Sequence, residues 1–257
     1  MNVGDEKGCG QSRDADLWRS RSKSYDRLKW ASDGGLLHFF IEQCEFKPGM
    51  RLLDVGTGTG HVLKEVQQYF DVEMFGLDLS PDMITIARQK VREAMLIISD
   101  VQAMALPDNT FDVVTARMMF HHVDDVMKGL KEVLRVLKPG GRLVFCEGVP
   151  PDYQAMDEYI RIFELKEKRH TFLDSMLLNL FHWSGFTRIT LRPYYMHRVS
   201  LNNWLQNSEL TKSIQDQIYD LHVNASPAFQ QLYRYERVGD DLLMDWKFVV
   251  LVGEKAS

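Results

Sequence analysis

Three glycines at alternate positions, Gly56, Gly58 and Gly60, follow a short apolar run that is interrupted by Asp54. An apolar run that stops at glycines predicts a buried parallel strand feeding a tight loop, and a helix is expected from about His61. Such a loop presents unpaired backbone N–H groups and lets a ligand approach the main chain, where a side chain would block it. The stretch therefore predicts a site for a nucleotide cofactor.

The spacing of these residues indicates which kind of nucleotide. A dinucleotide fingerprint needs a third glycine at position 61, where His61 stands instead. Asp54 at the strand end would repel a pyrophosphate but suits a ligand with an ammonium group. Asp78 ends a second predicted strand, where an acid can accept hydrogen bonds from both hydroxyls of a ribose. Together these residues predict an adenosine that carries a zwitterionic amino-acid tail.

Four motifs in order resemble the core of the class I S-adenosylmethionine-dependent methyltransferases, between about Met50 and Val149. They are LLDVGTGTGHV at 52–62, GLDLSPDMI at 76–84, SDVQAMALPDNTFDVVTARMMFHHV at 99–123 and LKEVLRVLKPGGRLVFCE at 130–147. The sequence is similar in particular to the small-molecule methyltransferases of quinone-biosynthesis type (methyltransferase type 11). The resemblance implies an α/β fold with a doubly wound, seven-stranded Rossmann-like sheet of order 3-2-1-4-5-7-6, whose last strand is antiparallel.

The same resemblance implies a site for S-adenosylmethionine, with S-adenosylhomocysteine as the product. The glycines would wrap the amino-acid tail, Asp54 would orient its ammonium group, Asp78 would bind the ribose, and Asp100 would accept from the adenine amine. An ordinary turn for the glycines and a helix cap for Asp100 are the alternative interpretations. The full set of expected cofactor residues is Tyr25, Asp54, Gly56, Thr57, Gly58, Gly60, Asp78, Leu79, Asp100, Val101 and Arg117.

Two adjacent histidines, His121 and His122, follow the fourth predicted strand near the edge where α/β proteins bind ligands. A histidine there can take a proton from a hydroxyl or amine acceptor. The alternative is that one histidine only fixes the loop, because the His-His-Val segment recurs in methyltransferases of unlike substrates. Glu147 either faces the acceptor or acts as a cap. Weaker candidates are Tyr194, Tyr195 and His197.

The alternation of predicted strands and helices favours one methyltransferase domain over residues 1–257. Within it we expect residues 1–12 to be disordered, 13–47 to form a helical N-terminal lid, 50–150 to bind the cofactor, and 151–183 and 200–240 to be helical insertions that cap the acceptor site. The sixth strand is expected at Phe186–Arg192 and the last at Leu243–Gly253.

The composition of the chain indicates which kinds of binding partner are expected. The chain of 257 residues has a formal net charge of −5, which gives no electrostatic reason to bind nucleic acid. No apolar stretch approaches the roughly 20 residues of a membrane span, so no integral membrane segment is expected. Three cysteines without metal-ligand spacing favour a reducing, cytoplasmic location and no metal site. The expected partner is a small-molecule methyl acceptor, and the expected oligomeric state is a monomer or a homodimer.

The function expected is transfer of a methyl group from S-adenosylmethionine to a small or medium-sized, partly apolar metabolite by in-line displacement. Whether the acceptor atom is O, N, C or S is left open. The alternatives are a protein that binds S-adenosylmethionine without transferring its methyl group, and a nucleotide-cofactor oxidoreductase on a related fold, which His61 and Asp54 disfavour.

Overall fold

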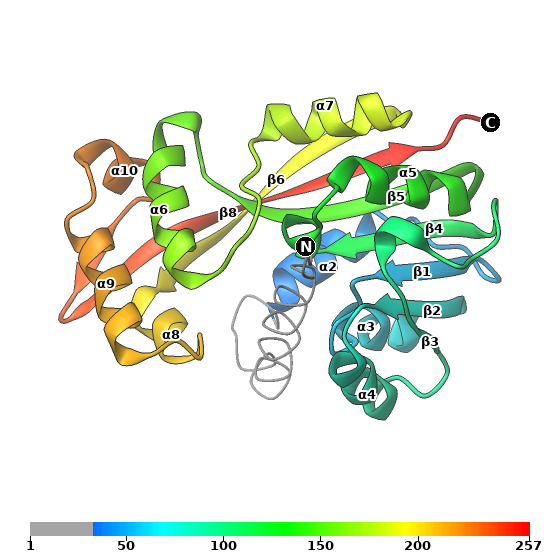
Figure 1. Ribbon diagram of the computed structural model, residues 1–257, viewed down its shortest axis with the longest axis horizontal. Coiled ribbons are helices and arrows are strands. Elements are labelled where there is room, and N and C mark those ends of the chain that lie inside the picture. Colours follow the sequence, from blue (N-terminus) through cyan, green and yellow to red (C-terminus); the bar gives the residue numbers. More distant parts are fainter. Residues whose placement is uncertain (1–32) are drawn as a thin grey trace, which may run out of the picture.

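A mixed β-sheet forms the centre of the protein in the computed structural model, which describes residues 33–257 (Figure 1). The strand order is β3-β2-β1-β4-β5-β8-β6, and the short β7 pairs with β8 outside this path. The first five strands are parallel, whereas β8 is antiparallel to both β5 and β6. The predicted order 3-2-1-4-5-7-6 is therefore confirmed, with β8 in the place of the seventh strand. The strands are β1 (Arg51–Val55), β2 (Glu73–Asp78), β3 (Met95–Ile98), β4 (Phe111–Arg117), β5 (Leu137–Val149), β6 (Thr187–Ser200), β7 (Glu236–Val238) and β8 (Asp241–Glu254).

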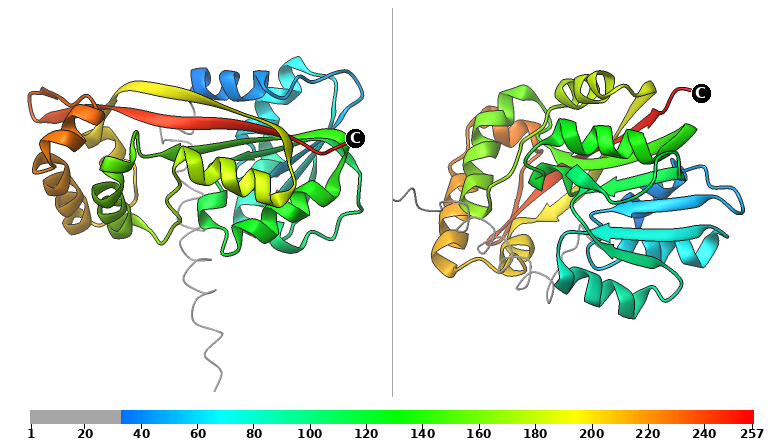
Figure 2. Two further views of the ribbon diagram at one scale, coloured as in Figure 1. Left: turned by 90° about the horizontal axis from the view of Figure 1, so that it is seen from above. Right: turned by 45° about the vertical axis from the view of Figure 1, so that its right-hand side comes forward.

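Helices cover both faces of the sheet (Figure 2). On one face, α2 (Gly34–Glu42) and α3 (His61–Tyr69) pack on a cluster that includes Leu52 and Val113. On the other, α5 (Val126–Val136) and α7 (Asp174–Ser184) pack on a cluster that includes Leu53 and Val114. Neighbouring residues of a strand thus point to opposite apolar layers, which is why these strands are near-continuous apolar runs.

Polar caps position the helices that follow the parallel strands. The Ser80 side chain accepts from the backbone N–H of Met83 and Pro81 occupies the first turn, so α4 (Pro81–Lys90) begins directly after β2. Asp125 caps α5 in the same way through Lys128. These caps leave the residues between each strand and its helix at the carboxyl-terminal edge of the sheet.

A helical lobe lies beside the sheet, over the far halves of β6 and β8, at the left of Figure 1. It contains α6 (Met156–Lys166), α8 (Leu201–Gln206), α9 (Lys212–Val223) and α10 (Pro227–Leu232). Its own apolar cluster includes Tyr159, Trp204 and Phe229 and is distinct from the two clusters of the sheet.

Two strands are longer than the sequence pattern predicts. β6 continues from the expected end at Arg192 to Ser200, and β8 runs from Asp241 to Glu254. The reason is that the two strands pair with each other beyond the rest of the sheet, with a register that extends to Ser200 and Leu243. β5 begins at Leu137 and includes the Lys-Pro-Gly-Gly segment of residues 138–141.

The expected regions of the chain map unevenly onto these elements. α6 belongs to the helical lobe, but α7 packs on α5 over the sheet, so only the first part of 151–183 lies near the lobe. The expected disorder of 1–12 and most of the expected lid, 13–32, lie outside the described residues. The division into lid, core and caps stays a prediction. Within the part of the chain that the structure describes, no helix is long and apolar enough to cross a membrane.

Candidate active site

The glycine-rich loop links β1 to α3 at the carboxyl-terminal edge of the sheet. The backbone N–H of Gly58 donates to Oδ2 of Asp78 over 2.8 Å, which ties the loop to the end of β2. Gly58 has a φ of +54°, a conformation that L side chains rarely adopt. Thr57 is buried, and its N–H donates to the carbonyl of Leu77 over 2.9 Å. The loop therefore brings the two acids predicted from sequence, Asp54 and Asp78, to one place.

Asp78 and Leu79 form the next part of this edge. Oδ1 of Asp78 accepts from the backbone N–H of Ser80 over 2.9 Å. Burial raises the pKa of this carboxyl group, while the backbone N–H groups of Ser80 and Gly58 oppose the shift. The side chain of Leu79 stands 68% exposed beside it. A carboxylate next to an exposed apolar side chain fits a ribose joined to a flat apolar ring.

Asp100, Val101 and Arg117 lie along the same edge, at the ends of β3 and β4. Oδ1 of Asp100 accepts from the backbone N–H of Gln102 over 2.8 Å and so caps the 3-10 helix η2 (Val101–Ala103). This is the capping role weighed from sequence, and a contact with adenine stays a prediction. Val101 packs in the apolar core and Arg117 is buried at the end of β4. Tyr25, the last expected cofactor residue, lies outside the described residues.

The expected cofactor residues from Asp54 to Val101, with Arg117, form what we call the cofactor edge. The segment after β4 connects this edge to a pocket. The side chain of Met119 packs so closely on Gly56 that a Cβ atom added there would lie 2.6 Å from it. The residue before Met119 is Met118, whose side chain lines the pocket. The residue after Met119 begins the 3-10 helix η3 (Phe120–His122), which carries both histidines. Gly56 is thus required by a close approach as well as by its φ of +64°.

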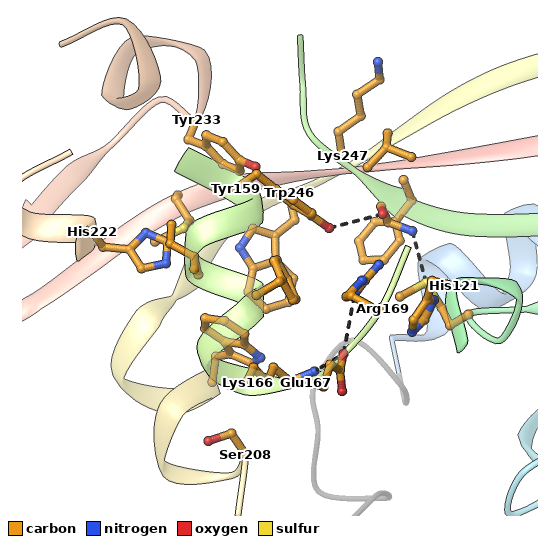
Figure 3. Close-up of a pocket in the computed structure, with 18 of the residues that line it drawn as sticks. His121, Tyr159, Lys166, Glu167, Arg169, Ser208, His222, Tyr233, Trp246 and Lys247 are labelled. Atoms are coloured by element: carbon orange, nitrogen blue, oxygen red, sulfur yellow. Dashed lines mark hydrogen bonds and ion pairs between the residues drawn. The ribbon is translucent and has the colours of Figure 1, made fainter. Parts of the chain in front are cut away.

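His121 lines the pocket (Figure 3) and forms a buried pair with Glu147, which lies behind it. Nδ1 of His121 lies 2.6 Å from Oε2 of Glu147, and the backbone N–H of His121 donates to Oε1 over 3.2 Å. Only 4% of the His121 side chain is exposed, and Glu147 is buried. Burial raises the pKa of Glu147 to about 7, while the charge of Arg169 opposes this shift. Glu147 therefore binds both the ring and the backbone N–H of the histidine predicted as the base, and a contact of Glu147 with the acceptor stays a prediction.

The pocket lies between the sheet edge and the helical lobe, opens to solvent, and has a cavity volume of about 100 Å³. Figure 3 shows Arg169 reaching into it, between Tyr159 and His121. His122 lines the pocket beside His121, with the two rings 4.1 Å apart between centroids. Sequence reasoning expected caps from regions 151–183 and 200–240 but did not single out most of the lining residues, which come from α6, α8, α9 and α10, from the residues that follow these helices, and from β8. They include Tyr159, Phe163, Lys166, Glu167, Arg169, Trp204, His222, Phe229, Tyr233 and Trp246.

The three weaker candidates from sequence lie away from the pocket lining. His197 is 60% exposed and pairs with Asp245 over 2.7 Å. Tyr194 packs against Phe39, with ring centroids 5.4 Å apart, and so joins β6 to α2. Tyr195 is exposed on β6.

Comparison with known proteins decides the family. Residues 53–145 match the family model described as a methyltransferase domain. A demethylmenaquinone methyltransferase of Symbiobacterium thermophilum is 32% identical over 201 residues, which are 74% of this chain and 77% of the relative. An uncharacterized methyltransferase of Bacillus subtilis, YcgJ, is 28% identical over 165 residues, 62% of each chain.

The chain belongs to the S-adenosylmethionine-dependent methyltransferases.

Solved structures agree with this methyltransferase fold. The crystal structure of YcgJ superposes with a TM-score of 0.77 at 23% identity, covering 86% of this chain and 98% of the other. A phosphoethanolamine N-methyltransferase of Haemonchus contortus, solved with S-adenosyl-L-methionine, superposes with a TM-score of 0.66 at 18% identity and covers 98% of this chain and 61% of the other.

The buried groups of this methyltransferase fit the family's cofactor. Oδ1 of Asp54 accepts from the hydroxyl of Thr115 over 2.7 Å, but its buried Oδ2 has no hydrogen-bond partner among residues 33–257. Burial raises the pKa of Asp54 to about 6, and the hydroxyl of Thr115 opposes this shift. A buried carboxylate with an unused acceptor suits an ammonium group, which would neutralise it.

Among residues 33–257, one group of three side chains has a spacing that could hold a metal ion. His121, His122 and Glu167 each offer a ligand atom, and these atoms lie within 4.8 Å of one another. Oε1 of Glu167 lies 2.9 Å from Nζ of Lys166 and 3.6 Å from Nη1 of Arg169. A divalent ion there would face both cations, so we interpret Glu167 as their counter-charge. The expectation of no metal stays a prediction.

Proposed function

We propose that this methyltransferase methylates a small or medium-sized, partly apolar acceptor that loses a proton in the reaction, with His121 as the general base. The observation that carries the proposal is the buried contact of 2.6 Å between Nδ1 of His121 and Oε2 of Glu147 at the pocket wall. When bound, the cofactor supplies an electrophilic methyl carbon on a sulfonium. Transfer then needs in-line approach of the acceptor, exclusion of water and a place for the acceptor's proton.

Glu147 supports the base role by fixing the proton on the other ring nitrogen. If Nδ1–H donates to the carboxylate of Glu147, Nε2 is the basic nitrogen of the ring, and the carboxylate stabilises the imidazolium that forms when Nε2 takes a proton. A carboxylate, an imidazole and an acceptor proton in series is an arrangement that many enzymes use. We assign the base to His121 because its ring makes the 2.6 Å contact with the carboxylate of Glu147.

The aromatic side chains of the pocket support an apolar acceptor body. Trp204 and Trp246 meet edge to face with ring centroids 5.5 Å apart, and Phe163 lies 5.8 Å from Trp204. Rings of this kind bury a large apolar area at little conformational cost. A cytoplasmic location, a monomer or homodimer, and the absence of nucleic-acid substrates remain predictions from the sequence.

The experiment that tests the proposal begins with transfer itself. Isotopically labelled S-adenosylmethionine is incubated with the protein and with fractionated small-molecule extracts. We expect a labelled product in one fraction. No labelled product from any fraction, together with tight binding of S-adenosylhomocysteine, would leave the alternative of a binding protein without transferase activity.

With a product in hand, His121→Asn and His122→Asn form a matched pair. We expect His121→Asn to lower turnover by about 100-fold or more with little change in cofactor affinity, because a general base acts only in the transition state. His122→Asn should retain most of the turnover. Native turnover in His121→Asn would return this residue to a structural role.

A further inference from the structure

Arg169 presents a buried cation to the pocket with few partners of its own. Its side chain is only 4% exposed. Nε reaches the carbonyl of His170 at 3.4 Å, Nη1 lies 3.6 Å from Oε1 of Glu167, and the buried Nη2 has no hydrogen-bond partner among the described residues. A guanidinium carries five N–H donors, and leaving buried charged donors unsatisfied is costly. The geometry indicates that another group completes this site.

Two aromatic rings of α6 hold the guanidinium in place. Its Cζ lies 4.6 Å from the ring centroid of Phe163 and 6.0 Å from that of Tyr159. Contact with ring faces orients the planar fork and leaves its N–H edges available for a ligand. Figure 3 shows this fork in the middle of the pocket, between the aromatic wall of the lobe and His121.

The neighbouring charges leave one positive charge in excess. Lys166 and Arg169 are cations and Glu167 is an acid, so these three residues together carry +1. Among the described residues of the lining, Lys247 is a further cation and is held by Asp174, with Nζ 2.9 and 2.8 Å from its two oxygens. The carboxylate of Glu147 lies outside the lining, where it binds His121 and also experiences the charge of Arg169, and Glu209 is an exposed residue of the lining. Within the group Lys166, Glu167 and Arg169, we assign the excess charge to Arg169, whose Nη2 has no hydrogen-bond partner among the described residues.

We infer that the methyl acceptor is a monoanionic organic acid whose carboxylate binds to Arg169 while its apolar body lies against the aromatic wall. The inference rests on the proposed function for the identity of the ligand as acceptor. The fork of a guanidinium matches a carboxylate in two parallel hydrogen bonds. One negative charge balances the +1 of Lys166, Glu167 and Arg169, whereas a phosphate dianion would bring a second negative charge into a buried site that already holds the carboxyl groups of Glu167 and, nearby, Glu147.

The test compares acids with neutral analogues of the same shape. Calorimetry with saturating S-adenosylhomocysteine measures the binding of 4-hydroxybenzoate against 4-hydroxybenzamide, and of 1-hydroxy-2-naphthoate against its amide. We expect at least one acid to bind about tenfold or more tightly than its amide, because the neutral amide cannot form the charge-assisted pair of hydrogen bonds with the guanidinium. Equal affinity of acid and amide in both pairs, or no binding of either acid at millimolar concentration, would overturn the inference.

Variants of neighbouring residues assign the preference to Arg169. Arg169→Gln should reduce the preference for the acid to within about threefold. Lys168→Gln is the matched control, since Lys168 adjoins Arg169 in sequence but is exposed and outside the lining, and it should keep the preference. A preference that survives in Arg169→Gln contradicts the assignment.

Glu167→Gln tests the charge balance in the opposite direction and does not depend on Arg169→Gln folding. Removing the acid raises the local charge from +1 to +2, so acids should bind several-fold more tightly and amides should not change. A merely structural Glu167 would weaken both ligands alike, and that result would overturn the charge argument. Binding of S-adenosylhomocysteine alone and methyl transfer to other acceptors are measured separately, so the proposed function can stand even where this inference fails.

Discussion

The cofactor edge and the acceptor pocket differ in how they are assembled from the chain. The cofactor edge takes its residues from between Asp54 and Val101, each just before or after the end of β1, β2 or β3, with Arg117 from the end of β4. The pocket takes its walls from between Met118 and Phe248, from the sheet edge, four helices and β8. One site is built from consecutive strand ends, the other from elements that meet only through tertiary packing.

This difference explains the chemistry that each site can perform. Strand ends and a glycine-rich loop present backbone N–H groups and a few acids in a fixed geometry that varies little with the surrounding side chains. The pocket depends on side chains, such as Arg169 over the ring of Phe163. We therefore expect substitutions in the pocket to change turnover and acceptor choice, and substitutions at the edge to change cofactor affinity.

Glu147→Gln should separate the two sites most strongly. Losing the negative charge beside Nδ1 of His121 removes the stabilisation of the imidazolium, so turnover should fall by about 100-fold or more. Because burial raises the pKa of Glu147 to about 7, wild-type turnover should rise as the pH increases through about 7, and this rise should be absent in the variant. Rate measurements from pH 6 to 8.5 check both points.

The cofactor site is the control in that experiment. Affinity for S-adenosylhomocysteine should stay within about twofold of wild type in Glu147→Gln, since the contacts of the glycine-rich loop do not involve this residue. A large loss of cofactor affinity without loss of turnover would contradict the separation of the two sites.

The sheet and the gathering of the expected cofactor residues at one of its edges could be predicted because their signals are local. The glycines after β1 and the acid at the end of β2 are fixed in spacing by the strand-loop-helix units that contain them, and the strand order followed from the resemblance. The sequence also predicted His121 and considered Glu147 beside the acceptor. Their contact was not predictable, because it joins residues 26 positions apart that come together only when β4 and β5 pair.

The regions 151–183 and 200–240 were expected to cap the acceptor site, but the individual residues that line the pocket escaped prediction for a physical reason. The run Lys166-Glu167-Lys168-Arg169-His170 has the composition of a solvated loop, yet the side chains of Glu167 and Arg169 are buried while Lys168 is exposed. Only the packing of α6 against the rest of the helical lobe and the sheet edge decides which of these charged side chains faces inward. The aromatic residues of α6 and α8 likewise have the spacing of an ordinary core helix, and nothing local distinguishes a ring that lines a cavity.

Acidification should weaken the helical lobe through His222. Burial lowers the pKa of this histidine to about 3, against an ordinary value of 6.5. Below pH 6.5 the unfolded chain binds a proton that the folded protein does not bind until about pH 3, so stability falls as the pH decreases through this window. At pH 5 the loss from this group is about 2 kcal/mol, from 1.36 kcal/mol per pKa unit.

Denaturant unfolding at pH 7.5 and pH 5 measures this loss as a difference between variants. His222→Gln should lack the contribution of about 2 kcal/mol, whereas His182→Gln, at an exposed histidine, should retain it. The comparison between variants is needed because Asp54 and Glu147 have raised pKa values and act in the opposite direction over the same range. Identical pH dependence in wild type and His222→Gln would contradict the assignment.

Asp78→Ala should act on the other site. The carboxylate anchors Gly58 and is placed to bind two hydroxyls, so its removal should weaken S-adenosylhomocysteine by about tenfold or more. Calorimetry on the folded variant measures this, and NAD should show no measurable binding to either protein. Unchanged affinity in the variant would contradict the ribose assignment, and micromolar binding of NAD would contradict the cofactor.

The smallest effect is expected at Leu79, and it tests whether the cofactor edge extends to this residue. Single exposed apolar side chains are common on protein surfaces and need no function, so the 68% exposure of Leu79 is by itself uninformative. For the same reason Leu79→Ala should change the stability of the free protein by no more than about 0.5 kcal/mol. If the side chain covers the adenine ring, the variant loses part of an apolar contact that forms only on binding, and affinity for S-adenosylhomocysteine should fall about three- to fivefold. Tyr69→Ala, at an equally exposed side chain on α3, should leave the affinity unchanged. If Leu79→Ala and Tyr69→Ala bind S-adenosylhomocysteine with equal affinity, Leu79 does not belong to the cofactor edge.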